Sequence, residues 1–147
     1  MKLVIKEFNE LTNTELYEII RARLEIFFIE QKMYCRDLDG IDYRALHCFL
    51  EEGGQIVAYL RAYVLEDRPD VVKIGRVLSM KHGVGIGRKL MQAALPQIID
   101  RLHCKTIFVS AQKQAVGFYQ KIGFSVISDE FLEEGVLHVN MELNTNE

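Results

Sequence analysis

Several features that assign a chain to a specialised class of protein are missing from this sequence. Its 147 residues include only three cysteines, an odd number with no paired spacing, which indicates reduced thiols in a cytoplasmic protein. The opening residues, 1–7, lack the long apolar region of a signal peptide, and no apolar run is long enough to span a membrane. We therefore expect a cytoplasmic protein with no membrane partner.

Basic residues are too few for a nucleic-acid-binding surface. The 18 Lys and Arg residues are outnumbered by 21 Asp and Glu residues, and the net charge of −3 at pH 7 argues against a nucleic-acid partner. Hydrophobic residues make up 49% of the chain and charged residues 27%, the balance of a soluble globular protein. Because linkers, internal repeats and low-complexity segments are also missing, we expect residues 1–147 to form one domain with a substantial core.

The most informative segment is a glycine-rich stretch, residues 82–88, between an apolar run (71–80) and an amphipathic run (86–102). Glycines at such a strand-to-helix junction leave backbone N–H groups free to point at one spot, and the helix dipole adds partial positive charge there. We therefore expect an anion site best suited to phosphate. The alternative is a tight turn before a helix with no ligand.

Two common phosphate motifs do not fit the spacing of these glycines. The dinucleotide fingerprint Gly-x-Gly-x-x-Gly fails because its sixth position is Arg88 when counted from Gly83 and Leu90 when counted from Gly85. No glycine here meets the spacing of a P-loop, in which Gly and four residues precede Gly-Lys-Ser/Thr.

Hydrophobic periodicity predicts helices and hairpins that give an α/β fold independently of any family. The expected strands span residues 3–8, 46–51, 55–65, 70–80, 106–110, 124–131 and 136–143, and the expected helices span 12–27, 86–102 and 112–122. Thr12 or Thr14 is expected to cap the first helix, with Glu15 completing a capping box. Pro96 predicts either a kink near residues 92–95 or a second short helix.

Glycines are expected to set the connections between these elements. Gly53 and Gly54 are expected to close the central hairpin, Gly123 to end the third helix, and residues 133–135 to turn the last two strands. The polar segment 32–44 is expected to be a loop, with or without a short helix in it.

Two motifs resemble those of the GNAT acetyltransferase superfamily. His82, Gly85 and Gly87 fall on the three fixed positions of its pyrophosphate loop, Gln/Arg-x-x-Gly-x-Gly/Ala, with His82 in place of the usual Gln or Arg. Downstream, residues 112–124 resemble Asn-x-x-Ala-x-x-x-Tyr-x-x-x-Gly-Phe, with Gln112 where Asn is usual. The matching residues of this second motif are Ala115, Tyr119, Gly123 and Phe124.

A finer resemblance is to the ElaA-like branch of this superfamily. It rests on the segments 28–31, 37–42, 74–77 and 134–138. The Cys-Pro-Tyr segment that often follows Glu-Gln in this branch is replaced here by Lys-Met-Tyr-Cys, residues 32–35. Because of such departures, the acceptor substrate is not transferred from the resemblance.

The resemblance implies both a fold and a reaction. The fold is a mixed, mostly antiparallel sheet flanked by helices, in which the strands 71–80 and 106–110 run parallel and splay apart to admit acetyl-coenzyme A (acetyl-CoA). The reaction is N-acetyl transfer from acetyl-CoA to a primary amine, directly within a ternary complex and without a metal. The acceptor is expected to be a small-molecule or peptide amine, and the protein a monomer or a homodimer.

By this resemblance, the glycine loop and the strand before it hold the donor. Backbone N–H groups around residues 84–88 face the pyrophosphate. The pantetheine arm pairs as an added strand with the backbone of residues 78–80, and an N–H in this segment polarises the thioester carbonyl. Gln112 sits where family members use Asn to bond pantetheine or the sheet. The predicted cofactor-binding residues are Leu78, Ser79, Met80, His82, Gly83, Val84, Gly85, Ile86, Gly87, Arg88, Gln112 and Tyr119.

Catalytic roles are assigned to three residues. By family analogy Tyr119 protonates the leaving thiolate, the alternative being a helix tyrosine with its ring on the core. His138 and Glu30 are candidate general bases, the alternatives being a structural histidine and a solvated or ion-paired glutamate. Arg76 is expected near the cleft by strand alternation, where it anchors an acceptor carboxylate or pairs with a surface acid, since a guanidinium cannot act as a base.

The acidic residues Asp37, Asp39 and Asp42 resemble a fragment of a calcium loop, but no suitably placed Glu completes the pattern. A solvated acidic loop that helps to attract a cationic amine is expected instead. Two other classes of function stay open: a non-catalytic acyl-CoA-binding or sensing module, and an interaction domain whose glycine loop is only a turn. An intact Tyr119 favours the enzyme over the sensor.

Overall fold

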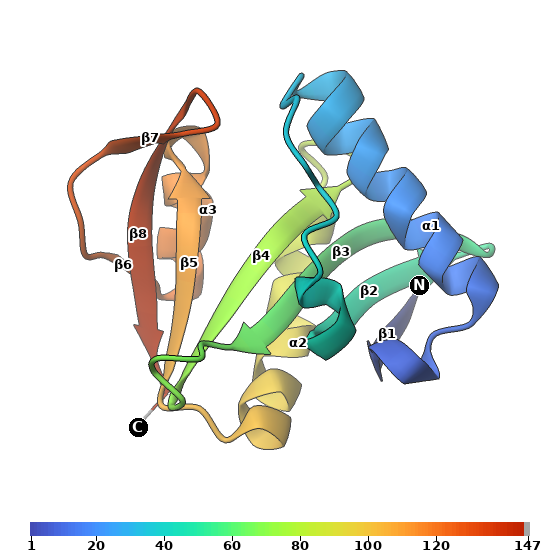
Figure 1. The fold of residues 1–147 in the computed structure, drawn as a ribbon, viewed down its shortest axis with the longest axis horizontal. Coiled ribbons are helices and arrows are strands. Elements are labelled where there is room, and N and C mark those ends of the chain that lie inside the picture. Colours follow the sequence, from blue (N-terminus) through green and yellow to red (C-terminus); the bar gives the residue numbers. More distant parts are fainter. Residues whose placement is uncertain (146–147) are drawn as a thin grey trace.

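Eight strands form one twisted sheet in the computed structural model, which describes residues 1–145 (Figure 1). They lie in the order β1-β2-β3-β4-β5-β8-β6, and β7 pairs with β8. All these pairs are antiparallel except β4–β5, so the expected mixed, mostly antiparallel sheet is confirmed. The strands are β1 (Lys2–Glu7), β2 (Leu46–Glu52), β3 (Gln55–Val64), β4 (Val71–Ser79), β5 (Thr106–Gln112), β6 (Ser125–Val126), β7 (Phe131–Glu133) and β8 (Val136–Asn144).

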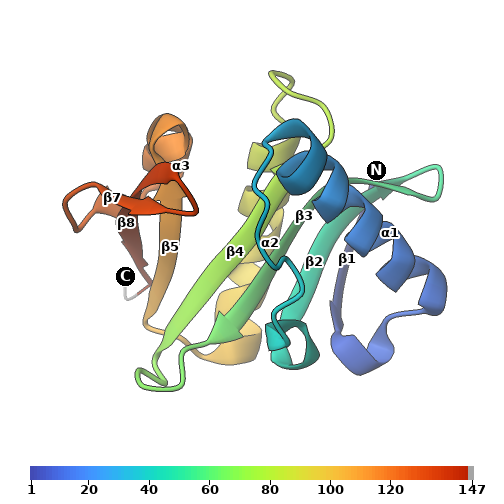
Figure 2. The same ribbon diagram turned by 45° about the horizontal axis from the view of Figure 1, so that its top comes forward.

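Helices cover both faces of this sheet (Figure 2). On one face, α1 packs over a cluster that includes Ile19, Phe49 and Tyr59, whereas α2 and α3 cover the main core on the other face. The helical segments are η1 (Phe8–Glu10), α1 (Asn13–Arg23), η2 (Leu24–Glu30), η3 (Ile41–Arg44), α2 (Ile86–Leu102), η4 (Lys113–Ala115) and α3 (Val116–Ile122).

The first helix begins as expected but changes its winding. Thr12 Oγ1 accepts a hydrogen bond from the Glu15 N–H at 3.0 Å, and Glu15 Oε1 accepts one from the Thr12 N–H at 2.9 Å. This capping box identifies Thr12 as the cap. The α-helix ends at Arg23 and continues as the π-helical η2, so the prediction of one regular helix is wrong for its C-terminal part.

Proline does not break the second helix. α2 runs from Ile86 to Leu102 in one piece, so a second short helix is wrong. Pro96 removes the hydrogen bond to the carbonyl of Gln92, but both residues are exposed, and water can bond that carbonyl.

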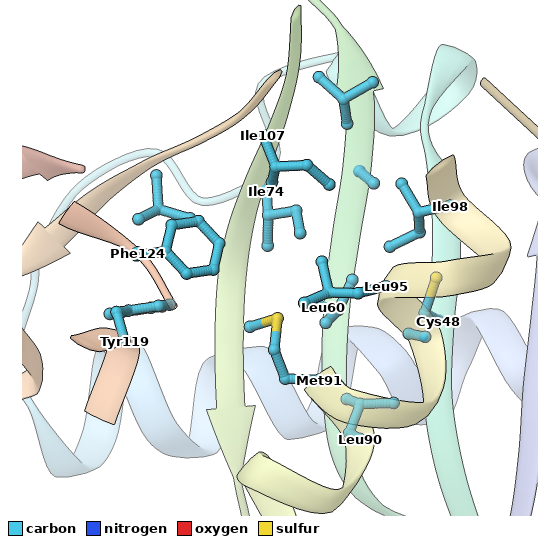
Figure 3. Packing of buried hydrophobic residues seen from close by; sticks show 14 of the residues in the cluster. Cys48, Leu60, Ile74, Leu90, Met91, Leu95, Ile98, Ile107, Tyr119 and Phe124 are labelled. Carbon is cyan, nitrogen blue, oxygen red and sulfur yellow. The ribbon is translucent and has the colours of Figure 1, made fainter. Parts of the chain in front are cut away.

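The main core fixes the central strands against α2 (Figure 3). Met91 and Ile98 of α2 pack in one cluster with Leu60 of β3 and Ile74 of β4, and all four side chains are fully buried. Burying each such side chain contributes about 1.5–3 kcal/mol. The backbone of β4 is therefore held firmly from the α2 side.

The C-terminal elements differ from expectation in extent. The strand expected over residues 124–131 forms only at β6 and β7, and the helix expected from Gln112 begins four residues later, because pairing with β8 extends β5 to Gln112. The central hairpin turn is confirmed, with φ of +59° at Gly53 and +80° at Gly54. Gly123 ends α3 as expected.

The two central parallel strands separate part of the way along the sheet. Residues 71–74 of β4 pair with residues 106–109 of β5, and beyond this point both strands continue without pairing to each other. They diverge visibly in Figure 2. Each strand keeps its other neighbour, β3 for β4 and β8 for β5, so the expected splay is confirmed.

Candidate active site

A cleft of about 800 Å³ lies where β4 and β5 diverge. Its walls come from η2 and the segment that follows it, from β3 and β4, and from β5, α3 and β8. Six residues with side-chain roles predicted from the sequence all line this cleft: Glu30, Arg76, His82, Gln112, Tyr119 and His138.

A bulge in β4 shapes one wall of the cleft. Tyr59 lies opposite Leu78 and Arg61 lies opposite Gly75, so β4 has one more residue than β3 between these two pairs. Within that interval Arg76 has a φ of +53°, in the left-handed region that residues with side chains rarely adopt. Because a bulge redirects side chains, simple strand alternation does not fix the direction of Arg76.

The glycine loop leads into α2 with a backbone that requires glycine. Gly83 and Gly85 have φ of +75° and +76°, and Gly85 is the N-cap of α2. No side chain bonds to the cap, so within residues 1–145 the N–H groups of the first turn of α2 lack a side-chain acceptor.

This helix start fits a phosphate group. The uncapped N–H groups lie at the positive end of the α2 dipole, and Arg88 and Lys89 add charge in the first turn. A Cβ placed on Gly87 would lie 3.8 Å from the Phe118 ring and 3.9 Å from Ser79, which is ordinary contact. The absence of larger side chains here keeps the backbone approachable.

His82, which replaces the usual Gln or Arg of the loop motif, is bound to another predicted site residue. Its Nε2 lies 2.7 Å from Glu30 Oε2. Because a carboxylate only accepts, the imidazole donates in this hydrogen bond. Glu30 is therefore ion-paired when His82 is protonated, and the pair joins the glycine loop to the end of η2.

Gln112 connects β5 to the opposite wall of the cleft. Its Nε2 donates to Gln31 Oε1 at 3.0 Å, and its Oε1 accepts from Gln114 Nε2 at 2.7 Å. The amide is thus bonded to two other glutamines, one of them on the segment that follows η2.

Tyr119 lines the cleft, and its ring packs in the core. It is 6% exposed, and its ring makes edge contacts with Phe118 and Phe124 at centroid distances of 5.1 and 5.5 Å. Burial raises the pKa of Tyr119, so the hydroxyl stays protonated at neutral pH and remains a donor. Within residues 1–145 this hydroxyl has no side-chain hydrogen-bond partner. The hydroxyl is therefore free to donate a hydrogen bond to a ligand.

His138 presents one nitrogen as an acceptor. Its Nδ1 lies 2.8 Å from the Val136 carbonyl, which only accepts, so Nδ1 carries the proton in the neutral ring. Nε2 then holds a lone pair and has no hydrogen-bond partner within residues 1–145. The ring stacks on Phe131 at 6.0 Å, and His138 pairs with Gln112 across β5 and β8.

The acidic segment expected to be solvated is instead held in an ion network. Arg23 donates to Asp37 Oδ2 at 2.9 Å and to Asp42 Oδ1 at 2.7 Å. Arg61 donates to both carboxylate oxygens of Asp39, at 2.8 and 2.6 Å, and to Asp42 Oδ1 at 3.0 Å. The Arg23 and Arg61 side chains are only 1% and 2% exposed, so the expectation of a solvated loop is wrong.

The physical reason is that a buried guanidinium needs carboxylate partners. Hydrogen bonds from Arg61 hold the pKa of Asp39 well below its usual range. Burial by itself raises the pKa of Asp42, but hydrogen bonds and charge from Arg23 and Arg61 outweigh it and lower that pKa. The carboxylates of Asp39 and Asp42 are therefore ionised at neutral pH.

Arg76 joins the same network. Its Nε lies 2.9 Å from Asp37 Oδ1, and its Nη2 donates to the Asp37 carbonyl at 2.9 Å. Of the two roles expected for Arg76, pairing with an acid is the one observed, although the acid is half-buried rather than fully at the surface.

Sequence reasoning missed several residues of the site. Arg23 and Arg61 sit at positions that the periodicity assigns to buried faces, four residues after Ile19 and between Tyr59 and Tyr63. A charged residue at such a position indicates a buried ion pair. The lining residues that had not been predicted also include Lys73, Ser110 and Glu133.

Among the helices of residues 1–145, none is both long and apolar enough to cross a membrane.

A sheet split between two parallel strands, with a glycine-capped helix starting beside the split, defines the architecture of an acetyltransferase. Residues 13–145 match the family model of the acetyltransferase (GNAT) domain, and the chain belongs to this family.

Relatives place the chain in the branch that the sequence resembles. A UPF0039 protein of Schizosaccharomyces pombe is 37% identical over 97% of both chains, and the protein ElaA of Escherichia coli is 29% identical over 90% of both. The crystal structure of ElaA covers 97% of this chain and 99% of its own, with a TM-score of 0.90 and 27% identity. An acyl-CoA N-acyltransferase from Pseudomonas aeruginosa gives a TM-score of 0.89 at 30% identity, with the same coverage.

Proposed function

We propose that this protein is an N-acetyltransferase that transfers the acetyl group of acetyl-CoA directly to a primary amine within a ternary complex. Two findings support this reaction: membership of the GNAT family, which typically binds acyl-CoA, and the likeness to the acyl-CoA N-acyltransferase of P. aeruginosa. The acceptor is a small-molecule or peptide amine.

The observation that carries this proposal is the uncapped start of α2 beside the open edge of β4. The N–H groups of residues 84–88 hold the pyrophosphate. Beyond residue 74, β4 is not paired with β5, so residues 78–80 offer backbone groups to the pantetheine amides as an added strand. When bound, acetyl-CoA supplies the activated thioester.

The remaining work is proton transfer, for which the protein has two uncommitted groups. The Tyr119 hydroxyl remains protonated at neutral pH and donates to the leaving thiolate. The Nε2 lone pair of His138 accepts a proton from the amine, directly or through water. Glu30 is the second candidate base, but it acts only after its hydrogen bond to His82 is released.

An amine panel with acetyl-CoA, followed by release of free thiol, tests the reaction. We expect free thiol to be released when acetyl-CoA and a suitable amine are both present. We also expect coenzyme A to raise the melting temperature. A melting shift without transfer to any amine would instead support a non-catalytic acyl-CoA-binding module. A melting curve unmoved by millimolar coenzyme A would contradict both functions.

A further inference from the structure

Three cationic side chains of β3 and β4 line the cleft: Arg61, Lys73 and Arg76. The two arginines are bonded to Asp37, Asp39 and Asp42. Lys73, in contrast, makes no hydrogen bond or ion pair within residues 1–145, although it is half-buried. Of these three cationic side chains, only Lys73 is therefore without a hydrogen-bond or ion-pair partner within residues 1–145.

Lys73 lies at the floor of the cleft. The last β4–β5 pair before the strands separate is Ile74 with Val109, and Lys73 with Phe108 is the pair before it. The ammonium sits 5.7 Å from the centroid of the Phe108 ring. Burial is the largest influence on the pKa of Lys73 and lowers it, and the opposing charge of Glu133 offsets this only in part, so the ammonium gains from an incoming anion.

Tyr63 is the neighbour of Lys73 across β3 and β4 and also lines the cleft. It is 7% exposed, and its hydroxyl has no hydrogen-bond partner within residues 1–145. Lys73 and Tyr63 are thus cross-strand neighbours that both line the cleft, and both side chains can donate a hydrogen bond.

The way from this floor to the β4 bulge is open. Gly75 lies between Lys73 and Arg76, and a Cβ placed on it would meet no atom within 4 Å. The regular part of β4 from residue 73 to residue 75, where the bulge begins, spans about 7 Å at about 3.3 Å per residue. An extended aliphatic chain of several carbons has a comparable length.

We propose that Lys73 and Tyr63 form a carboxylate subsite, and that the preferred acceptors are primary amines with a carboxylate at the far end of the chain. This inference rests on the proposed function. Two donors match the two oxygens of a carboxylate, whereas a phosphate dianion would leave an oxygen unbonded.

Glu133 points to the competing possibility, a distal cation. It lines the same cleft but is exposed on β7, whereas Lys73 is half-buried. Electrostatic attraction is stronger where water is excluded, so the field of Lys73 decides which distal group is preferred.

The test compares acceptors that differ only in their distal group. Linear ω-amino acids of four, five and six carbons, n-alkylamines of the same lengths and the corresponding diamines are assayed with acetyl-CoA. We expect at least one ω-amino acid to exceed its matched alkylamine about tenfold or more in kcat/KM, because hydrogen bonds to a charged group are lost in the alkylamine.

Lys73→Met should abolish the preference for ω-amino acids by raising their KM, and it should leave the alkylamine rates unchanged. Lys73→Arg should retain most of the preference. Tyr63→Phe should reduce it partly. Coenzyme A binding, measured by melting temperature, should stay the same in all three variants. A preference for diamines that Glu133→Gln removes would overturn the subsite, and so would a loss in Lys73→Met that is equal for every acceptor.

A second measurement does not depend on turnover. Binding of the N-acetyl ω-amino acids to the coenzyme A-loaded protein is followed by calorimetry in the wild type and in Lys73→Met. Weaker binding in the variant supports the subsite even when no amine is acetylated, in which case only the proposed reaction fails. Equal binding in both proteins overturns the subsite whether or not the reaction occurs.

Discussion

His82 and Glu30 are 52 residues apart in the sequence and meet at 2.7 Å between Nε2 and Oε2. Their contact ties the glycine loop to the end of η2, beside the helix start that fits a phosphate. A pyrophosphate bound at this helix start, as proposed above, would bring a second anion close to the same imidazole. His82 would then lie between Glu30 and that pyrophosphate.

Glu30→Gln should tighten coenzyme A binding a few-fold. The substitution removes a carboxylate near the phosphate site, and an exposed charge pair of this kind is worth up to about 1 kcal/mol. His82→Ala should weaken coenzyme A binding, because it removes a side chain that can donate to the phosphate. Calorimetry measures both affinities, and equal affinities for wild type and His82→Ala would show that the backbone alone binds the phosphate.

Gly87→Leu should abolish the rise in melting temperature caused by coenzyme A. A large side chain at this position blocks approach to the N–H groups at the start of α2. Gly87→Ala is the matched control, because its Cβ makes only ordinary contacts and Ala stabilises a helix by about 0.5–1 kcal/mol relative to Gly. Without ligand the Ala variant should therefore melt higher and still respond to coenzyme A. A full response in Gly87→Leu would place the phosphate elsewhere.

Asp42→Asn should destabilise the fold by about 3 kcal/mol or more. Asp42 accepts from both Arg23 and Arg61, and its loss leaves two buried guanidinium groups short of a carboxylate. Glu130→Gln is the control, since Lys113 and Glu130 form an exposed pair at 2.9 Å whose loss should cost less than about 1 kcal/mol. Urea denaturation of both variants makes the comparison. Equal losses would show that the network adds nothing beyond a surface pair.

The same network predicts sensitivity to acid. The folded-state pKa values of Asp39 and Asp42 lie below the usual value of 3.8, so their stabilising contribution is complete above that pH. It is lost as pH falls below about 4 and the carboxylates take up protons. The free energy of unfolding should therefore drop less steeply with acid in Asp42→Asn than in the wild type, as urea denaturation between pH 3 and 6 will show.

Much of the fold follows from local sequence patterns that can be recognised without knowing the tertiary structure. The Thr12 capping box, the Gly53-Gly54 turn and the helix end at Gly123 depend on residues close together in the chain. The splay between β4 and β5 came instead from the family resemblance, since no local pattern indicates where two parallel strands separate.

The parts that were missed depend on partners far away in the sequence. Asp39 is 22 residues from Arg61, and only the folded chain shows that the acidic segment meets buried arginines rather than water. The pairing of β5 with β8, which lengthens β5 at the expense of the following helix, is likewise a tertiary effect. No sequence motif pointed to Lys73, because what distinguishes this residue is that its ammonium makes no hydrogen bond or ion pair within residues 1–145.

His138→Gln should lower turnover with a good acceptor by about 100-fold while coenzyme A binding is kept. The substitution removes the Nε2 lone pair that the Nδ1 hydrogen bond to Val136 leaves available. If turnover is unchanged and Glu30→Gln loses it instead, Glu30 is the base.

Tyr119→Phe should lower turnover about 100-fold or more with little change in stability or in coenzyme A affinity. The ring and its contacts with Phe118 and Phe124 remain, and the lost hydroxyl has no side-chain partner within residues 1–145. Such a loss confined to turnover marks an interaction made mainly in the transition state. Because burial raises the pKa of Tyr119, the hydroxyl keeps its proton throughout the neutral range, and the defect should not vary with pH between 6 and 9. Unchanged turnover would remove Tyr119 from the mechanism, and a joint loss of stability and binding would assign the hydroxyl to the packing of α3.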